Sequence, residues 1–255
     1  MGCLWRGYLH QEVTRHDADR PDRTDRPGAA DAAPSEASGS ADRRVLRDFS
    51  LHVPAGETHA IVGSTGSGKS TMARQVMALE TPTSGSVTLL GQDLHGLSAI
   101  ELREARRHIQ MVFQDPISSL NPRRKVGDIV AEPLLIWGET PLPQVRDRVE
   151  RMLDFVGLDA TDVWSRRPHE FSGGQCQRIG IARAMILRPR LIVCDEPVSA
   201  LDVSIQAQIV NLLMSLQREF GLSLIFISHN LAVVRHICHR IMVLYLGRMC
   251  EIADR

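Results

Sequence analysis

Short apolar runs alternate with longer amphipathic segments from Val45 to the end of the chain. The runs have the length of strands buried in a sheet, whereas the amphipathic segments repeat their apolar residues every three or four positions, as helices do. Strands are predicted at residues 45–53, 58–62, 86–90, 109–113, 191–194, 222–227, 241–246 and 248–252. Helices are predicted at residues 69–80, 98–107, 126–137, 144–156, 174–187, 203–220 and 231–238. Because strands and helices alternate, the pattern predicts an α/β fold with a parallel sheet.

Two stretches depart from this alternation. Residues 17–42 are rich in Asp, Arg, Pro, Ala and Ser and carry almost no large apolar side chain. Such a composition buries too little apolar surface to offset the entropy lost on ordering, so residues 1–44 are predicted to be disordered. Residues 115–170 are mostly helical, more charged and punctuated by prolines. We therefore expect one folded domain at 45–255, with a helical subdomain inserted at about 115–170.

The composition narrows the classes of protein to consider. The 255-residue chain has 43% hydrophobic and 24% charged residues, which is ordinary for a globular protein. Its 30 basic and 30 acidic residues give a formal net charge of zero, so no nucleic-acid partner is expected. The five cysteines are scattered without a C-x-x-C pair, which indicates reduced thiols in a cytosolic protein. No apolar run approaches the roughly 20 residues that span a bilayer, so a membrane role is expected to come through a partner.

The strongest chemical signal follows the predicted strand at 58–62. Residues 63–71, here called the phosphate loop, fit the pattern G-x-x-x-x-G-K-[ST]. Glycines let backbone N–H groups curl around a phosphate, and the positive end of the following helix faces the same anion. Lys69 can reach the β- and γ-phosphates of a nucleotide, and the Ser70 hydroxyl can bind Mg²⁺. The alternative is a glycine-rich surface loop, but the flanking strand and helix favour a nucleotide site. The candidate nucleotide-binding residues are Gly63, Ser64, Thr65, Gly66, Ser67, Gly68, Lys69, Ser70 and Thr71.

Two carboxylates follow the apolar strand predicted at 191–194. Asp195 is expected at the carboxyl end of that strand, where open α/β sheets bind their ligands, and it is suited to hold Mg²⁺. Glu196 can orient and deprotonate an attacking water. The alternative, an acidic pair that only complements a helix dipole, loses weight because a phosphate loop lies upstream.

A second glycine-rich turn precedes the helix predicted at 174–187. It consists of Ser172, Gly173, Gly174 and Gln175, and it offers backbone N–H groups and a hydroxyl at a helix start. A simple helix cap is the alternative. Because one chain does not need two γ-phosphate sites, we expect this turn to complete the nucleotide site of a second subunit.

Together these motifs resemble the ATP-binding cassette (ABC) ATPases. Ser172–Gln175 resembles their signature sequence, about twenty residues before Asp195. Gln114 matches the glutamine loop, 199–202 matches the loop that ends in Asp202, and His229 matches the histidine loop. With the phosphate loop and the Asp195–Glu196 strand, six motifs stand in the family's order. Residues 113–123 and 167–171 are similar to segments of oligopeptide, dipeptide and nickel importer ATPases.

The resemblance implies a fold and a function. The fold would be a P-loop NTPase core with a parallel sheet, an N-terminal antiparallel β-subdomain and an inserted α-helical subdomain. ATP would lie between two subunits, in a homodimer or a heterodimer, with Asp202 acting across the interface. Ser70, Gln114 and Asp195 would hold Mg²⁺, Glu196 would act as general base, and His229 would sense the γ-phosphate.

The implied partners are membrane proteins. The dimer would power integral permease subunits that import peptides or similar small solutes, supplied by an extracytoplasmic solute-binding protein. The subunit would sit peripherally on the cytoplasmic face of the cell membrane. The helical subdomain would form the groove that receives a permease helix.

The sequence departs from the family where adenine is bound. No aromatic residue stands between Tyr8 and Phe49, so the usual stacking residue is missing, which predicts ATP binding weaker by about 1–3 kcal/mol. Trp5 or Tyr8 could substitute, and the alternation of Phe49 with apolar neighbours favours core packing for that residue.

Two other functions remain open from the sequence. One is a soluble ABC ATPase without a permease, such as an accessory subunit of a phosphonate-cleaving enzyme complex. The other is a degenerate subunit that binds ATP and hydrolyses little, which the intact Lys69, Asp195, Glu196 and His229 argue against.

Overall fold

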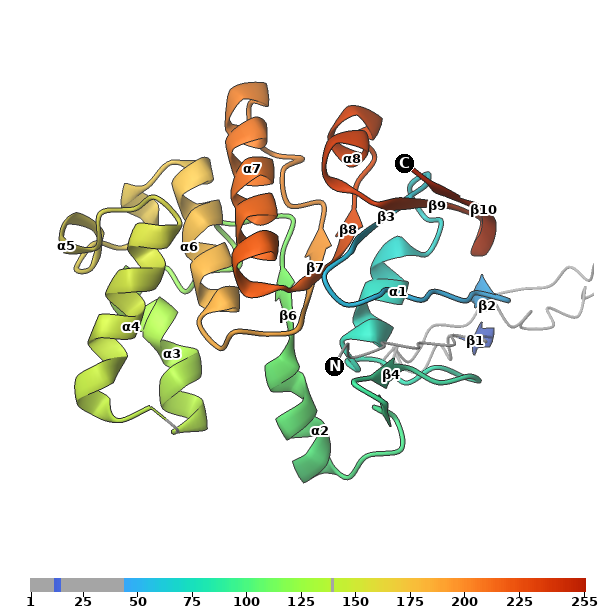
Figure 1. Ribbon diagram of the computed structural model, residues 1–255, viewed down its shortest axis with the longest axis horizontal. Helices are drawn as coiled ribbons and strands as arrows, with labels where there is room; N and C mark the ends of the chain where they lie inside the picture. The colour runs from blue at the N-terminus through green and yellow to red at the C-terminus, as the bar shows by residue number, and fades with distance from the viewer. Residues whose placement is uncertain (1–11, 15–43, 139) are drawn as a thin grey trace, which may run out of the picture.

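The computed structural model describes residues 12–14, 44–138 and 140–255, in which strands and helices alternate (Figure 1). The strands are β1 Glu12–Thr14, β2 Arg44–Arg47, β3 Thr58–Val62, β4 Thr88–Leu89, β5 Gln92–Asp93, β6 Ile109–Val112, β7 Leu191–Asp195, β8 Ser223–Ile227, β9 Arg240–Tyr245 and β10 Arg248–Asp254. The α-helices are α1 Lys69–Val76, α2 Ala99–Ala105, α3 Val126–Trp137, α4 Leu142–Phe155, α5 Ala160–Val163, α6 Gly173–Met185, α7 Val203–Phe220 and α8 Leu231–Ile237. Short 3₁₀ turns at Arg106–His108 and Pro168–Glu170 complete the described elements.

The main sheet brings the ends of three strands to one edge. Among the described residues its order is β1-β2-β10-β9-β3-β8-β7-β6. The strands from β9 to β6 run parallel, as predicted, whereas β10 is antiparallel to β9. Ile227 at the end of β8 pairs with Ile61 of β3 and with Asp195 of β7. The loop after β3 and the carboxylates after β7 therefore lie at the same carboxyl edge.

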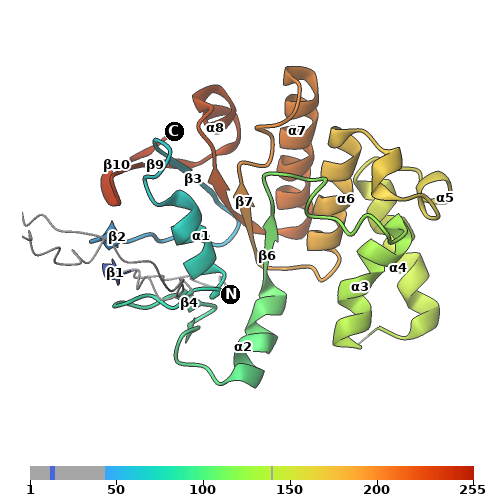
Figure 2. The same ribbon diagram turned by 180° about the vertical axis from the view of Figure 1, so that it is seen from behind.

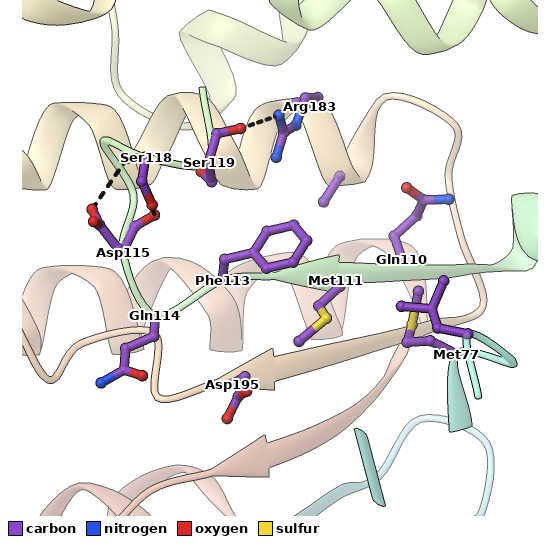
Figure 3. Close-up of a pocket in the computed structure, with 12 residues that line it drawn as sticks. Met77, Gln110, Met111, Phe113, Gln114, Asp115, Ser118, Ser119, Arg183 and Asp195 are labelled. Carbon is purple, nitrogen blue, oxygen red and sulfur yellow. Dashed lines mark hydrogen bonds between the residues drawn. The ribbon is translucent and has the colours of Figure 1, made fainter. Parts of the chain in front are cut away.

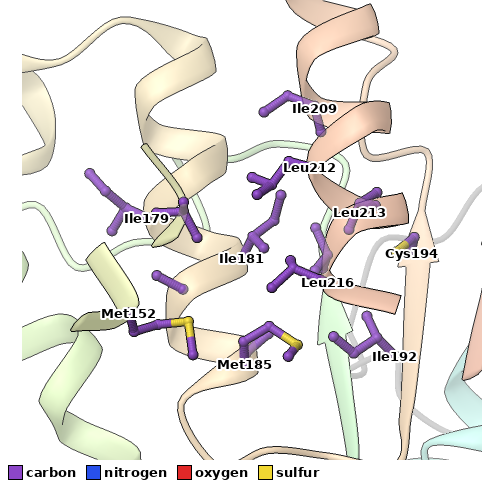
Figure 4. Packing of buried hydrophobic residues seen from close by; sticks show 14 of the residues in the cluster. Met152, Ile179, Ile181, Met185, Ile192, Cys194, Ile209, Leu212, Leu213 and Leu216 are labelled. Carbon is purple, nitrogen blue, oxygen red and sulfur yellow. The ribbon is translucent and has the colours of Figure 1, made fainter. Parts of the chain in front are cut away.

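Both faces of this sheet are buried, which explains why its strands are continuously apolar. In β7, Ile192 and Cys194 point into a cluster with α6 and α7, as Figure 4 shows. Leu191 and Val193 point the other way, into a cluster with α1. In Figures 1 and 2, α1 accordingly lies across the sheet from α6 and α7.

The helical block lies at one end of the molecule in both views, where α3, α4 and α5 pack beside α6. The predicted insertion at 115–170 contains these three helices, and the predicted bounds of α3 and α7 agree with the structure. A small antiparallel pair, β4 with β5, lies outside the main sheet. Within the described ranges, no helix has the length and apolarity needed to cross a membrane.

The single strand predicted at 45–53 is wrong. The strand β2 ends at Arg47 because Asp48 has φ 48°, a left-handed conformation that interrupts an extended backbone. Phe49 and the apolar residues at 51 and 53 are nevertheless buried, so the core role predicted for Phe49 is confirmed. The alternation correctly predicted burial at residues 49, 51 and 53, although residues 49–53 form no regular strand.

The helix predicted at 69–80 is too long, because Ala78 takes φ 52°. The Ala78 N–H donates to the Gln75 carbonyl and the Leu79 N–H donates to the Arg74 carbonyl, closing the helix soon after Val76. The strand predicted at 86–90 is likewise shorter, because the chain turns back after Leu89 to form the β4–β5 pair.

The capping box predicted for the helix at 98–107 is confirmed. The Ser98 N–H donates to Glu101 Oε2 at 2.9 Å, and the Glu101 N–H donates to Ser98 Oγ at 3.4 Å. At the start of the chain, β1 pairs antiparallel with β2, which the sequence did not predict. The disorder predicted for the rest of 1–44, and the adenine contact considered for Trp5 or Tyr8, concern positions outside the described residues.

Candidate functional site

The phosphate loop has the geometry of an anion cradle. Gly68 caps α1 with φ 105°, and a Cβ there would lie 2.7 Å from Leu46 Cδ2. A Cβ on Gly63 would lie 2.1 Å from the Leu244 carbonyl oxygen. Both positions therefore exclude a side chain, and the backbone N–H groups at the start of α1 are left open to a phosphate.

Lys69 lies across this cradle. Its Nζ donates to the carbonyl oxygens of Gly63 at 2.8 Å and Ser64 at 2.9 Å, and the side chain is buried. The hydroxyl of Ser67 is also buried and has no partner among the described residues. A buried ammonium and an unpaired hydroxyl fit the phosphates of a nucleotide, as the sequence predicted for both residues.

Asp195 carries carboxylate oxygens of the kind that bind a divalent cation. The Ser70 hydroxyl donates a hydrogen bond to its carboxylate. Burial raises the pKa of Asp195 above its ordinary value, while that hydrogen bond and the positive charges of Lys69 and Arg74 oppose the rise. A partly desolvated carboxylate beside a hydroxyl is the kind of donor set that Mg²⁺ prefers, so these residues fit the cation that the sequence predicted.

Glu196 faces two of the other predicted residues. Gln114 Nε2 donates to Glu196 Oε2 at 3.4 Å, and His229 Nδ1 lies 3.3 Å from the same oxygen. The Glu196 side chain is 19% exposed, whereas that of His229 is 65% exposed. The backbone of Glu196 has φ 47°, and its N–H donates to the Ile227 carbonyl at 3.0 Å. The structure therefore brings Gln114, Glu196 and His229 together, a grouping that the separate motifs did not reveal.

The signature turn lies on a different part of the molecule. Ser172 and Gln175 form a reciprocal cap, with the Ser172 N–H 3.0 Å from Gln175 Oε1. A Cβ on Gly174 would lie 2.6 Å from Ile205 Cγ2 of α7. A Cβ on Gly173 would lie 3.4 Å from Leu201, next to the exposed Asp202. The turn thus packs on α7 and the residues before it, while α1, the helix that follows the phosphate loop, lies across the sheet from α6 and α7 (Figures 1 and 2).

A groove of about 760 Å³ opens beside Gln114 and Asp195 (Figure 3). It lies between the end of α1, strand β6, the segment after it and helix α6. Its lining residues are Met77, Leu79, Gln110, Met111, Phe113, Gln114, Asp115, Ser118, Ser119, Arg183, Ala184 and Asp195.

The sequence predicted a groove formed by residues 115–170, whereas only Asp115, Ser118 and Ser119 of that block line this groove. Leu79 is 58% exposed because α1 ends before it, and the longer predicted helix concealed that exposure. Arg183 of α6 reaches into the groove, where its Nη1 donates to the Ser119 carbonyl at 2.7 Å (Figure 3). Burial lowers the pKa of Arg183, while Glu132 opposes the change.

Residues 46–199 match the ABC transporter family. The chain belongs to this family. The resemblance that the six motifs predicted is therefore confirmed, together with the α/β fold of an ABC ATPase.

Two curated relatives of this ABC protein have been named for peptide transport. The oligopeptide transport ATP-binding protein OppF of Salmonella typhimurium is 59% identical over 210 residues, covering 82% of this chain and 63% of that protein. The di/tripeptide transport ATP-binding protein DppF of Pseudomonas aeruginosa is 52% identical, covering 84% of this chain and 66% of that protein. The chain thus spans just under two thirds of the length of these relatives.

A solved structure shares the architecture. The dimeric post-hydrolysis state of the ATP-binding cassette MJ0796, bound to ADP and Pi, superposes with a TM-score of 0.76. It is 31% identical, and the match covers 86% of this chain and 94% of that one.

Proposed function

We propose that this ABC protein is an ATP-hydrolysing subunit that dimerises around ATP and powers a permease importing peptides or similar small solutes. The observation that carries the proposal is the Glu196 carboxylate, held between Gln114 and His229 at the sheet edge that also bears Lys69 and Asp195. A general base beside a phosphate-binding loop is an arrangement suited to phosphoryl transfer to water.

Each predicted residue has a role in this proposal. The phosphate loop and Lys69 would bind the phosphates, and Ser70, Asp195 and Gln114 would hold Mg²⁺. When bound, the cation neutralises charge on the β- and γ-phosphates. Glu196 would accept the proton of the attacking water, and His229 would orient that water and the γ-phosphate.

The signature turn supports a dimer as the working unit. Its hydroxyl and backbone N–H groups start helix α6, whereas the phosphate loop of the same chain leads into α1, which lies across the sheet from α6. A second subunit, identical or related, would place its own Ser172–Gln175 and Asp202 against this chain's ATP. The dimeric state of the MJ0796 cassette supports this arrangement.

The groove supports a permease partner. Leu79 and Phe113 leave 58% and 43% of their surfaces exposed on its wall, which favours an apolar helix as occupant. Gln114 belongs both to this wall and to the contact with Glu196, so docking and hydrolysis would meet at one residue. The subunit would then lie peripherally on the cytoplasmic face of a membrane.

The names of OppF and DppF favour a peptide importer, served indirectly by an extracytoplasmic solute-binding protein. They do not favour the soluble alternative that assists phosphonate cleavage.

Replacing Glu196 tests the proposal. We expect Glu196→Gln to lower ATP hydrolysis at least about 100-fold, because a positioned base contributes roughly 10²–10⁴ to the rate. We expect the variant to accumulate as an ATP- and Mg²⁺-dependent dimer on size-exclusion chromatography. Glu150→Gln changes a half-buried carboxylate on α4, away from the candidate site, and should match the unchanged protein.

Unchanged hydrolysis by Glu196→Gln would refute the role of this residue. If the chain stays monomeric alone but dimerises when co-expressed with a related ATPase, the working unit is a heterodimer.

A further inference from the structure

The segment before the signature turn is organised by one arginine. Arg166 Nη2 donates to the Glu170 carbonyl at 2.8 Å, and its guanidinium carbon lies 4.3 Å from the centre of the Phe171 ring. Its Nη1 also pairs with Asp162 Oδ2 at 3.0 Å. Glu170 and Phe171 are the two residues that directly precede Ser172. Arg166 therefore contacts the backbone of Glu170 and the side chain of Phe171, just before the signature turn.

These contacts suit a guanidinium better than an ammonium. The planar fork of a guanidinium can stack on a ring while its N–H groups reach a carbonyl and a carboxylate in the same plane. The ion pair with Asp162 is solvent-exposed and stabilises little by itself, since 66% of the Asp162 side chain is accessible. Arg166 is 34% exposed and the partly buried Phe171 ring packs against the hydrophobic core, so the ring contact is better shielded than the ion pair.

The backbone of the same segment is tied to α3. Helix α3 has no side-chain cap, and its first N–H groups are satisfied instead by two carbonyls of this segment. The Val126 N–H donates to the Arg166 carbonyl at 2.9 Å, and the Gly127 N–H donates to the Trp164 carbonyl at 3.1 Å. Arg166 thus connects the start of α3 with the start of α6. In the sequence, α3 comes shortly after residues 113–119, which contribute to the groove wall.

We propose that Arg166 is a positioning residue, which sets the orientation of the signature turn Ser172–Gln175 for the ATP held by a partner subunit. This inference rests on the proposed function, because the turn has a ligand only in the dimer. The hydrogen bonds, ion pair and ring contact described for Arg166 involve no residue of the chain's own phosphate loop. Loss of Arg166 should therefore weaken dimerisation and leave nucleotide binding by the single subunit intact.

The chain provides a matched control. Arg146 stacks on the Trp164 ring at 5.1 Å and pairs with Glu150 at 2.7 Å. It therefore makes the same two kinds of interaction in the same subdomain, and neither contact involves residue 170 or 171. If Arg166 acted only by stabilising the helical block, removal of Arg146 would have a comparable effect.

The experiment compares variants in the Glu196→Gln background. Dimer formation with ATP and Mg²⁺ is followed against protein concentration by size-exclusion chromatography. We expect Arg166→Ala to raise the dimer dissociation constant at least about tenfold, which corresponds to about 1.4 kcal/mol. Arg166→Lys should give a dissociation constant between those of the parent and Arg166→Ala, because lysine keeps the charge and lacks the planar guanidinium. Arg146→Ala should change the dissociation constant less than about twofold.

A second measurement separates positioning from misfolding. Binding of a fluorescent ADP analogue, which reports on the phosphate loop of the single subunit, should change less than about twofold in each variant. If Arg166→Ala and Arg166→Lys dimerise like the parent, or if both lose the ADP analogue as well, the inference is wrong. If the Glu196→Gln parent itself never dimerises, alone or with a related ATPase, the proposed function fails and the inference fails with it.

Discussion

Asp195 and Glu196 are adjacent carboxylates that the backbone turns into different surroundings. Asp195 closes β7 and is partly desolvated beside Ser70, and this burial raises its pKa. Glu196 has a left-handed φ, and its own carboxylate points toward Gln114 and His229 instead. A non-glycine residue in that conformation is uncommon, and such strain is concentrated at functional sites. The sequence predicted a role for each carboxylate, but it carried no signal for the turn that separates them.

His59 predicts how stability responds to acid. Burial lowers the pKa of His59 below its ordinary value of 6.5, although the Glu57 carboxylate, 2.8 Å from Nε2, opposes the change. Arg240 and His239 lower the pKa further. The unfolded chain therefore binds this proton at a higher pH than the folded chain does. We expect the free energy of unfolding to be unaffected by this group above pH 6.5 and to fall as the pH drops below it.

Urea unfolding between pH 5 and 7.5 measures this dependence. His59→Gln should show a smaller loss of stability on acidification than the unchanged protein. His236→Gln, which alters an exposed histidine of α8, should retain the full loss. Parallel curves for all three proteins would show that His59 does not contribute to the acid response.

At the scale of helices and strands, periodicity was informative wherever the backbone stays regular. The bounds of α3 and α7 follow from their apolar spacing, and the burial of Phe49 follows from alternation. The errors arise where non-glycine residues take a left-handed φ, at Asp48 and Ala78. Alanine gives no turn signal, since its usual preference is for helix. Only the tertiary contacts of these segments decide such conformations, and a single sequence does not contain them.

The packing of α6 on α7 can be tested with two glycines of one helix. A Cβ on Gly174 would lie 2.6 Å from Ile205 Cγ2, on a β-branched side chain with little rotamer freedom. We expect Gly174→Ala to lower the free energy of unfolding by about 1–3 kcal/mol and to reduce ATP hydrolysis. A Cβ on Gly180 meets no described atom within 4 Å, so Gly180→Ala should raise stability by up to about 1 kcal/mol.

Chemical denaturation and an ATPase assay distinguish these cases. Adding Ile205→Ala to Gly174→Ala should recover part of the lost activity, because it removes the clashing methyl group. Equal effects of the two glycine substitutions would mean that close approach to α7 does not determine the position of the turn.

At the scale of the whole molecule, local motifs predicted the candidate phosphate-site residues, whereas the groove is assembled by the fold. Lys69, Asp195 and Glu196 come from patterns that are local in sequence. The groove combines Leu79, Phe113 and Arg183, which lie on three separate elements and share no pattern. Residues assembled in this way become visible only when the sheet and helix α6 are placed together.

The groove gives a prediction for membrane association. Leu79→Asp would place a charge on its apolar wall, since this side chain is 58% exposed there. We expect it to reduce co-purification with co-expressed permease subunits at least about tenfold, because a docked apolar helix would leave the new carboxylate desolvated and unpaired. ATP binding by the isolated subunit should stay within about twofold.

Ile100→Asp is the matched control for this variant. Ile100 on α2 is 79% exposed and does not line the groove. Loss of the permease from both variants, or from neither, would argue against docking in the groove.

Strand β6, which forms part of that groove, is the terminal strand of the described sheet. A terminal strand presents a row of backbone N–H and C=O groups that a strand of another molecule can pair with, which is a known route to aggregation. A helix docked in the groove would cover the part of β6 that lines it. If the proposed function holds, a subunit made in excess of its permease would lack this cover, and β6 could pair with other copies. The amount of permease in the cell would then set how much of this ATPase can accumulate in soluble form.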